Sequence, residues 1–274
     1  MFRIINKEKL AKDVVRISVE ALLIAKKAQA GQFVVLIADE KGERIPLTLA
    51  DWDRRKGTIT LIFQEVGFTT RKLAVKNAGD AVGHILGPLG HPTEVKNFGR
   101  VICIGGGVGI AEVFPVSRAF KEAGNQVAGI VGARSKELLI LEKEMNRVCD
   151  ELYVTTDDGS CGRKGFVSDV LKDLLSVKRQ PSTVNLIYAI GPLVMMRAVS
   201  EITRPLKIKT VVSLNPIMVD ATGMCGACRC VIAGETKFAC VEGPDFDAHQ
   251  IDFQELEKRI NQYKVQEQQI RDTL

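Results

Sequence analysis

The cysteines of one Gly-rich stretch are the residues whose types and spacing most clearly suggest a chemical function. The chain has seven cysteines, and four of them fall in DATGMCGACRCVIAGETKFAC at 220–240. Plant-type [2Fe-2S] loops use the spacing C-x4-C-x2-C with a fourth cysteine further on, because one tight loop must deliver several sulfurs to two irons. A carboxylate at the first position has the charge of a thiolate and binds iron through oxygen. We therefore predict a [2Fe-2S] site with the ligands Asp220, Cys225, Cys228 and Cys240.

Three alternatives to this ligand set remain open. Cys230 could replace Asp220, because alternate residues of an extended segment point to the same side and Cys230 is two residues past Cys228. A structural zinc site favours two separated thiolate pairs, whereas this chain offers one C-x2-C pair and Cys240. A disulfide is disfavoured by the odd cysteine count and by the lack of a signal peptide.

Composition narrows the class of protein. The 274 residues are 46% hydrophobic and 26% charged, which is typical of a globular protein with a packed core. No apolar run of about 18 residues occurs, and MFRIINKEKL at the N-terminus resembles no secretory signal, so we expect a cytoplasmic protein without a membrane span. The net charge of +5 is spread without a basic block, which argues against nucleic acid. Three histidines, none in a catalytic-looking group, favour redox chemistry over hydrolysis.

Residues 1–97 show the pattern of a small antiparallel β-barrel. VVRISVEA, QFVVLIA, TITLIFQEV and AVGHILGPL are short apolar or alternating runs separated by turn residues. Arg44-Ile-Pro-Leu-Thr48 lies between the second and third runs, and Gly67-Phe-Thr-Thr70 follows the third and opens a helix. A cation and the amides of a helix N-terminus would together bind a pyrophosphate. The alternative interpretation is a hydroxyl N-cap and a surface arginine.

From residue 98 to about 215 the pattern changes to α/β. A short apolar strand at 101–104 leads into Gly105-Gly106-Gly107-Val108-Gly109, and a helical period follows from Ile110 to Ala123. Such a loop lets backbone amides approach a dinucleotide pyrophosphate, with a helix dipole behind them. The motif is not the full G-x-G-x-x-G, so a βα turn that merely needs glycine is the alternative.

Further strands and helices alternate after this loop, which predicts a doubly wound parallel sheet. Ligands of such sheets bind at the carboxyl ends of the strands. The expected strand ends carry Gly132-Ala133-Arg134, Asp157-Asp158 and Gly191-Pro192. Arg134 could meet a 2′-phosphate, and the two aspartates a ribose or carboxamide, although turn chemistry explains the aspartates equally well.

The order of these parts resembles the ferredoxin-NADP reductase superfamily, and within it the dihydroorotate dehydrogenase electron-transfer subunits. The resemblance covers nearly the whole chain. Loops of that family normally begin with cysteine, and Asp220 at this position is similar to the small subunits of NADH-dependent reduced ferredoxin:NADP oxidoreductases, also described as sulfide dehydrogenase subunits. Two departures stand out: Ile45 interrupts the arginine-rich flavin pattern, and Glu112 replaces a common proline.

The resemblance implies the cofactors and partners. It implies FAD, NAD(H) with NADP(H) possible, a [2Fe-2S] cluster, and a heterodimer with a large FAD and iron-sulfur subunit that connects to ferredoxin. It implies electron bifurcation, with electron transfer from dihydroorotate oxidation to NAD as the alternative; a redox-sensing binding protein is a more distant one. The flavin residues that it implies are Arg44, Pro46, Leu47, Thr48, Ile62, Phe63, Gln64, Gly67, Thr69 and Thr70.

The C-terminal part completes the predicted organisation. We expect the cluster loop to occupy 216–250 and one last helix to follow within 251–274, over residues 251–271. Phe253, Leu256, Ile260 and Tyr263 form an apolar stripe at helical spacing, which predicts packing on the chain's own domain or, alternatively, a partner surface.

Overall fold

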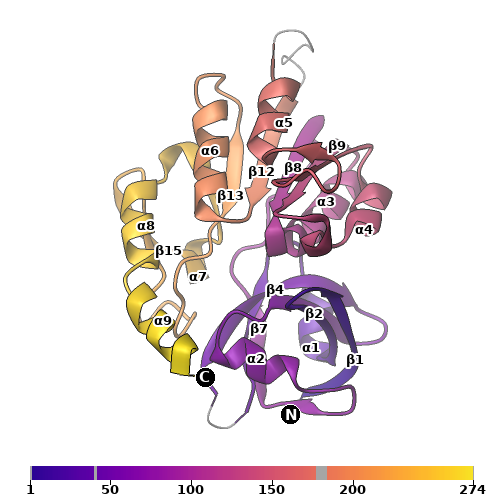
Figure 1. Ribbon diagram of the computed structural model, residues 1–274, viewed down its shortest axis with the longest axis vertical. Coiled ribbons are helices and arrows are strands. Elements are labelled where there is room, and N and C mark those ends of the chain that lie inside the picture. Colours follow the sequence, from indigo (N-terminus) through magenta and orange to yellow (C-terminus); the bar gives the residue numbers. More distant parts are fainter. Residues whose placement is uncertain (1, 40–41, 177–183, 274) are drawn as a thin grey trace. The chain divides into compact units, whose positions relative to one another are not determined.

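The computed structural model describes residues 2–39, 42–176 and 184–273 and divides the chain into two compact units (Figure 1). The first unit comprises Met1–His91, Asn215–Pro244 and Ile251–Leu274, and the second comprises Pro92–Leu214 and Asp245–Gln250. The N-terminal sheet, the cysteine loop and the C-terminal helices thus belong to one unit. The four-part division of the chain expected from the sequence stays a prediction.

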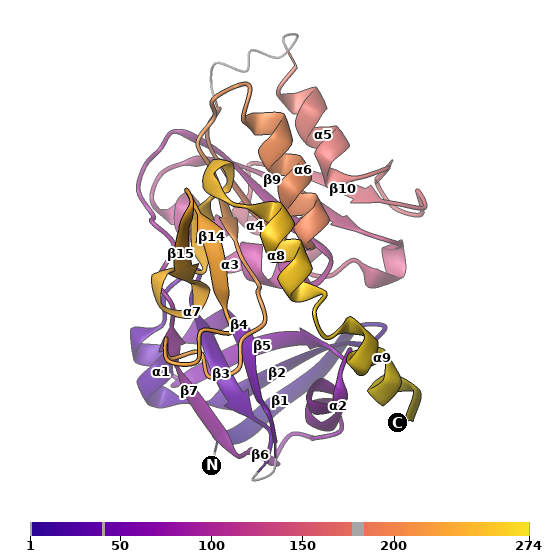
Figure 2. The ribbon, with the colours of Figure 1, turned by 90° about the vertical axis from the view of Figure 1, so that its left-hand side faces the viewer.

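Seven antiparallel strands of the first unit form one curled sheet in the order β6-β1-β2-β5-β4-β3-β7 (Figures 1 and 2). The edge strands β6 and β7 are separated in the chain by Gly83 alone, so one short segment supplies both edges and the sheet curls into a half-barrel, in agreement with the predicted barrel class. The strands are β1 (Phe2–Ala11), β2 (Val14–Glu20), β3 (Phe33–Ile37), β4 (Arg44–Asp53), β5 (Thr58–Gln64), β6 (Ala81–Val82) and β7 (His84–Leu89).

The barrel buries one face of each long strand. Ile17, Leu36, Leu61 and their neighbours form its core, to which the short helices α1 (Leu22–Lys27) and α2 (Phe68–Ala74) contribute. The sequence pattern did not predict β1, because its charged residues leave Ile4 as its one fully buried side chain. It also did not predict β4.

The second unit contains a seven-stranded sheet in the order β11-β10-β9-β8-β12-β13-β16, in which only β16 is antiparallel to its neighbour. From β8 the sheet continues through β9 and β10 on one side and through β12 and β13 on the other. This is the predicted doubly wound topology. The strands are β8 (Arg100–Gly106), β9 (Gln126–Ala133), β10 (Glu151–Thr156), β11 (Arg163–Lys164), β12 (Val184–Ile190), β13 (Thr210–Ser213) and β16 (Asp245–Asp247).

Helices α3 and α4 pack together on this sheet, and α5 and α6 pack together as a second pair (Figure 1). The helices are α3 (Ile110–Glu122), α4 (Glu142–Val148), α5 (Val167–Leu174) and α6 (Leu193–Thr203). Helix α4 does not follow β9 directly, because Lys136–Leu138 forms a separate 3-10 turn and Leu141 is left-handed at the N-cap of α4.

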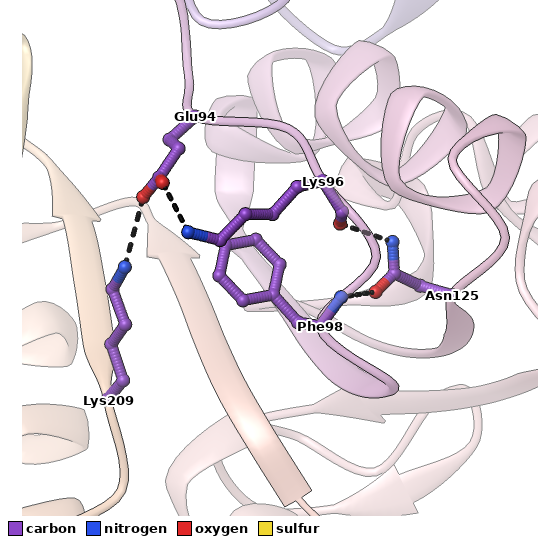
Figure 3. Close-up of polar contacts among 5 residues, drawn as sticks. All are labelled: Glu94, Lys96, Phe98, Asn125 and Lys209. Carbon is purple, nitrogen blue, oxygen red and sulfur yellow. Dashed lines mark hydrogen bonds and ion pairs between the residues drawn. The ribbon is translucent and has the colours of Figure 1, made fainter.

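The segment that enters the second unit is held by polar contacts around Phe98 (Figure 3). Glu94 pairs with Lys96 at 2.6 Å and with Lys209 at 3.0 Å, and both ammonium groups lie over the Phe98 ring. The buried Asn125 side chain accepts from the Phe98 amide at 2.7 Å and donates to the Lys96 carbonyl oxygen at 2.9 Å. These contacts lie before β8, at the opposite end of that strand from the glycine loop.

A small module in the first unit carries the four clustered cysteines, Cys225, Cys228, Cys230 and Cys240. A hairpin of β14 (Arg229–Ile232) and β15 (Glu235–Phe238) is followed by α7 (Ala239–Glu242). Figure 2 shows α8 (Phe253–Ile260) beside this hairpin, where Phe253 and Leu256 are buried.

The prediction of a single last helix is wrong. Helix α8 ends at Ile260, and a separate helix, α9 (Lys264–Thr273), follows it. The apolar stripe stops being buried at this point, since Tyr263 is 48% exposed and Val265 68%. Tertiary packing supports most helical stability, so a stretch without a buried stripe has less to keep it continuous with α8. The first half of the stripe packs on its own unit.

Candidate functional site

The backbone of the predicted cluster loop is tightly turned. Ala221, Gly223 and Gly226 all have left-handed backbone angles, with φ of 61°, 86° and 65°. The amides of Ala227 and Asp220 lower the pKa of the exposed Cys225 thiol, against the smaller effects of burial and of the Asp220 carboxylate. The loop therefore stabilises a thiolate at Cys225 and brings Asp220 next to that sulfur.

Cys228 and Cys240 approach each other from the two ends of the hairpin. The Cys240 amide donates to the Cys228 Sγ at 3.4 Å, and each residue is 2% exposed. Burial raises the pKa of Cys240 to about 12, and the Cys228 thiol and Cys225 contribute in the same direction. Three of the four predicted ligands are thus neighbours, and two are sheltered from water.

Asp220 is held by two donors. Arg44 Nη1 donates to Asp220 Oδ1 at 2.7 Å, and the Thr222 hydroxyl donates to Asp220 Oδ2. The Asp220 side chain is 21% exposed. Both donors engage the carboxylate at the position where the sequence predicts the first ligand.

Cys230 has a different environment. It is buried in β14, and its thiol donates to the Lys237 carbonyl oxygen of β15 at 3.6 Å. Burial raises the pKa of Cys230 to about 12, with the Cys228 thiol and Glu255 of α8 acting in the same direction. This bond gives the Cys230 thiol a partner within the hairpin. The choice of Asp220 rather than Cys230 as the fourth cluster ligand stays a prediction.

The donor set fits an iron-sulfur cluster. In the described part of the chain, no three His, Cys, Asp or Glu side chains already have the geometry of a closed metal site. Nevertheless, thiolates are the usual ligands of such clusters, and hydrogen bonds to the sulfurs set their potentials. A carboxylate has the charge of a thiolate and can bind iron through oxygen. Asp220, Cys225, Cys228 and Cys240 are the residues that would hold it.

The glycine loop and the Gly191-Pro192 turn meet at the carboxyl edge of the parallel sheet. A Cβ on Gly106 would lie 3.2 Å from Pro192 Cδ and 2.5 Å from Met195 Sδ. A Cβ on Gly191 would lie 3.1 Å from the Gly106 backbone. The two segments come from β8 and β12, between which the strand order reverses, and this is where doubly wound sheets bind their ligands.

The glycines of this loop serve different purposes. A Cβ on Gly109 would lie 2.6 Å from the Ile190 carbonyl oxygen, so Gly109 is required by sheet and helix packing. Gly107 has a φ of 58°, and a Cβ there would meet nothing within 4 Å. Of these two residues, Gly107 is therefore the one that leaves open space in front of α3, where a ligand backbone could approach.

The turn after β10 lies against the end of β9. The amides of Asp157 and Asp158 donate to the carbonyl oxygens of Ala133 and Arg134 at 3.1 and 3.2 Å. Asp158 accepts from the Ser160 hydroxyl at 2.6 Å, and this bond lowers its pKa. Asp158 therefore has a turn-forming role in the structure, whereas Arg134 is exposed beyond the strand. Their contacts with a nucleotide stay predictions.

The predicted flavin residues lie on β4, β5 and α2. Pro46 and Thr48 share one face of β4 with Arg44, whereas Ile45 and Leu47 pack against the barrel core. At the end of β5, Phe63 lies in that core, and Ile62 and Gln64 point to the other face. A flavin on the outer face would therefore meet Pro46, Thr48, Ile62 and Gln64, with Leu47 and Phe63 offering only backbone.

The hydroxyls at the start of α2 already have partners within the chain. Thr70 Oγ1 accepts from the Gly67 amide at 3.0 Å, which is one half of a capping box, because glycine has no side chain to accept the return bond. Thr69 Oγ1 donates to Glu43 at 2.8 Å. Pyrophosphate binding here would depend on the amides of the first turn rather than on these hydroxyls.

The sequence did not reveal two residues at the candidate site. Thr222 contacts the Asp220 carboxylate, and Met195 packs against the glycine loop. The threonine could have been noticed because it lies inside the loop, whereas nothing in the sequence indicated Met195 or the pairing of Arg44 with Asp220.

A barrel, a doubly wound nucleotide sheet and a cysteine loop together define the class of pyridine-nucleotide-dependent iron-sulfur flavoprotein oxidoreductases. The family model described as the iron-sulfur cluster binding domain of dihydroorotate dehydrogenase B matches residues 215–252, and the oxidoreductase NAD-binding domain matches residues 103–201. Phthalate dioxygenase reductase, with 15% identity and a TM-score of 0.57 over 84% of this chain and 85% of its own, shares the fold.

Similarity over the full chain defines the family. The dihydroorotate dehydrogenase B (NAD(+)) electron transfer subunit homolog of Thermotoga maritima is 45% identical over 96% of this chain and 92% of its own length. The electron transfer subunit of Geobacillus thermodenitrificans is 30% identical over 90% of this chain and 96% of its own. The chain therefore belongs to the family of dihydroorotate dehydrogenase B electron-transfer subunits and their homologs.

A solved structure of NADH-dependent reduced ferredoxin-NADP oxidoreductase, described for flavin-based electron bifurcation, is more similar in fold than phthalate dioxygenase reductase. One of its chains matches with a TM-score of 0.92 and 43% identity, over 100% of this chain and 97% of its own. This chain is an oxidoreductase subunit with an iron-sulfur domain and an NAD-binding domain, and its described residues include no helix that is long and apolar enough to cross a membrane.

Proposed function

We propose that this chain is the electron-transfer subunit of an NADH-dependent reduced ferredoxin-NADP oxidoreductase. In this role it exchanges electrons between NAD(H), FAD and a [2Fe-2S] cluster and passes them to a large FAD and iron-sulfur partner in a heterodimer, through which ferredoxin reacts. The observation that carries the proposal is the full-length match to the bifurcating oxidoreductase, at 43% identity and a TM-score of 0.92.

The site geometry supports a separate role for each part of the chain. When bound, FAD connects the two-electron chemistry of a nicotinamide to the one-electron chemistry of a cluster. The open side of Gly107 and the N-terminus of α3 bind the dinucleotide phosphates, and the outer face of β4 orients the flavin. Cys228 and Cys240, which are buried, would shield one side of a bound cluster from water, and the exposed Cys225 would hold it at the surface.

A cytoplasmic location belongs to this proposal. All seven cysteines are free thiols, as expected in a reducing compartment, and the proposed ligands must stay reduced to bind iron.

The second candidate is electron transfer from dihydroorotate oxidation to NAD, within the same family. The relatives from Thermotoga maritima and Geobacillus thermodenitrificans favour it by name. Asp220 argues against it, because the resemblance to that subunit leads us to expect cysteine at the first ligand position.

Purification of the native complex from its source would test the proposal. We expect one FAD and two iron atoms on this chain, a larger partner with its own flavin and iron-sulfur clusters, and NADP reduction that requires both NADH and reduced ferredoxin. A complex that instead reduces NAD with dihydroorotate, and does not react with reduced ferredoxin, would establish the second candidate. Recovery of FMN alone from this chain would exclude the predicted pyrophosphate site.

A further inference from the structure

The contact that Arg44 makes in the structure differs from its expected role. The sequence pattern places it on the flavin pyrophosphate, yet its Nη1 donates to Asp220 Oδ1 at 2.7 Å, from a residue 176 positions away in the chain. Both residues belong to the first unit, so the contact forms within one compact body. The neighbouring residue, Ile45, carries no charge and packs against the barrel core.

From this contact we propose that Arg44 is a positioning residue for the iron-sulfur cluster, acting through Asp220. This inference rests on Asp220 being the fourth ligand, as the proposed function has it. With Arg44 on Oδ1, the second oxygen, which Thr222 contacts, is the one left available to iron. Arg44 would thereby favour binding through one oxygen and would supply a positive charge to the ligand.

The environment of the pair fits this role better than a role in stability. The Arg44 side chain is 52% exposed, and exposed ion pairs contribute little to folding. Its guanidinium, in contrast, is a planar donor whose shape matches a carboxylate. Arg44 is also the first residue of β4, so the barrel sheet fixes the backbone from which it reaches the loop.

A definite electrostatic effect follows. Reduction adds negative charge to the cluster, and a nearby guanidinium stabilises that charge more than it stabilises the oxidised state. Loss of Arg44 should therefore lower the midpoint potential of the cluster. A pyrophosphate ligand role would instead make its loss weaken flavin binding and leave the cluster potential unchanged.

The test uses the full-length protein with both cofactors and four variants. Arg44→Gln removes the charge, Arg44→Lys keeps the charge but not the planar fork, and Asp220→Ala removes the proposed ligand. Arg16→Gln is the matched control, because Arg16 of β2 forms another ion pair of the same unit, with Glu8. FAD content, iron content, the midpoint potential and the electron paramagnetic resonance spectrum of the reduced cluster are measured for each.

We expect Arg44→Gln to retain one FAD and to show a lower midpoint potential with altered g-values, while Arg16→Gln matches the parent protein. Arg44→Lys should recover most of the potential but not the g-values. If Arg44→Gln does not fold, a parental spectrum in Arg44→Lys overturns the proposal.

Loss of FAD from Arg44→Gln with a parental cluster potential would also overturn it and return Arg44 to the flavin. A parental spectrum in Asp220→Ala would show that the proposed ligand set itself is wrong. An altered spectrum in Asp220→Ala beside a parental one in Arg44→Gln would reject only the role of Arg44. Flavin reduction by NADH, measured separately in each variant, reports on the proposed function independently of the cluster.

Discussion

Tyr188 of β12 donates a hydrogen bond to Asp245 Oδ1 at 3.0 Å, in the interior of the second unit. Thr93 donates to the other carboxylate oxygen at 2.6 Å. Asp245 lies on β16, the strand by which the chain returns to the nucleotide sheet after the cysteine module. These bonds join three segments of the second unit through one carboxylate.

This arrangement predicts a specific dependence of stability on pH. Burial raises the pKa of Asp245 to about 6, although hydrogen bonds from Thr93 and Tyr188 oppose the shift. Between about pH 4 and pH 6 the folded state keeps a proton that the unfolded state releases, so this group's contribution to stability falls as the pH rises. The loss by pH 7 amounts to no more than about 3 kcal/mol.

Asp245→Asn should remove this dependence, because the amide stays neutral and keeps the shape of the side chain. Urea unfolding at pH 4.5 and pH 7.5 should show a stability difference between variant and parent that grows toward the higher pH in favour of the variant. Asp247→Asn, an exposed aspartate on the same strand, serves as the control. A difference that does not change with pH would contradict the prediction.

Substitutions at Gly107 and Gly109 of the glycine loop should have different effects. Gly107→Val meets open space, so we expect folding with a loss of about 1 kcal/mol from its left-handed backbone and retention of FAD. Flavin reduction by NADH should fall by about 100-fold or more, since the bulky residue displaces the dinucleotide. Stopped-flow absorbance measures this rate.

Gly109→Ala is the companion change, and it should lower the free energy of unfolding by about 2 kcal/mol, because its Cβ would press on the Ile190 carbonyl. Normal NADH reduction in Gly107→Val would show that the loop has only a structural role.

Two cysteines that are two residues apart provide a matched test of the cluster ligands. Cys228→Ser should lose or cripple the cluster, because the Cys228 sulfur faces Cys240. Cys230→Ser should keep it, because that thiol is hydrogen-bonded to Lys237 across the hairpin and serine can make the same bond. Electron paramagnetic resonance of the dithionite-reduced proteins distinguishes the cases. A signal lost in Cys230→Ser and unchanged in Asp220→Ala would mean an all-cysteine cluster.

Replacement at the first ligand position should change the cluster without removing it. Asp220→Cys should retain a [2Fe-2S] centre with an altered potential and spectrum, since a thiolate replaces an oxygen ligand. Potentiometric titration followed by visible absorbance provides the measurement. An unchanged potential would indicate that residue 220 does not bind iron.

Asn125 should contribute more to stability than the ion pairs beside it. Its buried side chain bonds to the amide of Phe98 and to the carbonyl oxygens of Lys96 and Phe120, so Asn125→Ala would leave backbone groups without partners. We expect a loss of about 2 kcal/mol or more in the free energy of unfolding. Glu94→Gln, which weakens the exposed ion pairs of Figure 3, should cost less than about 1 kcal/mol. Chemical denaturation of both variants compares the two, and equal losses would contradict this ranking.

Local pattern was sufficient to predict the parts of the chain whose signals lie close together in sequence. Strand β8, the glycine loop and α3 were recognisable because an apolar run, several glycines and a helical period follow one another directly. The cysteine loop was recognisable because all its candidate ligands lie within one short segment. β1 and β4 were missed because charged or exposed residues obscure their alternation. The break between α8 and α9 was missed because it depends on where tertiary burial of the stripe ends.

By itself, the sequence determined the doubly wound topology, the presence of a barrel and the identity of the candidate ligands, since these depend on periodicity and on the chemistry of residue types. Only the tertiary structure decided which partner each side chain meets. It separated Cys228 from Cys230 by turning one toward Cys240 and the other toward Lys237. It also brought Arg44 to Asp220, because a contact between residues so far apart in the chain arises from the folding of the barrel and the cysteine module into one unit.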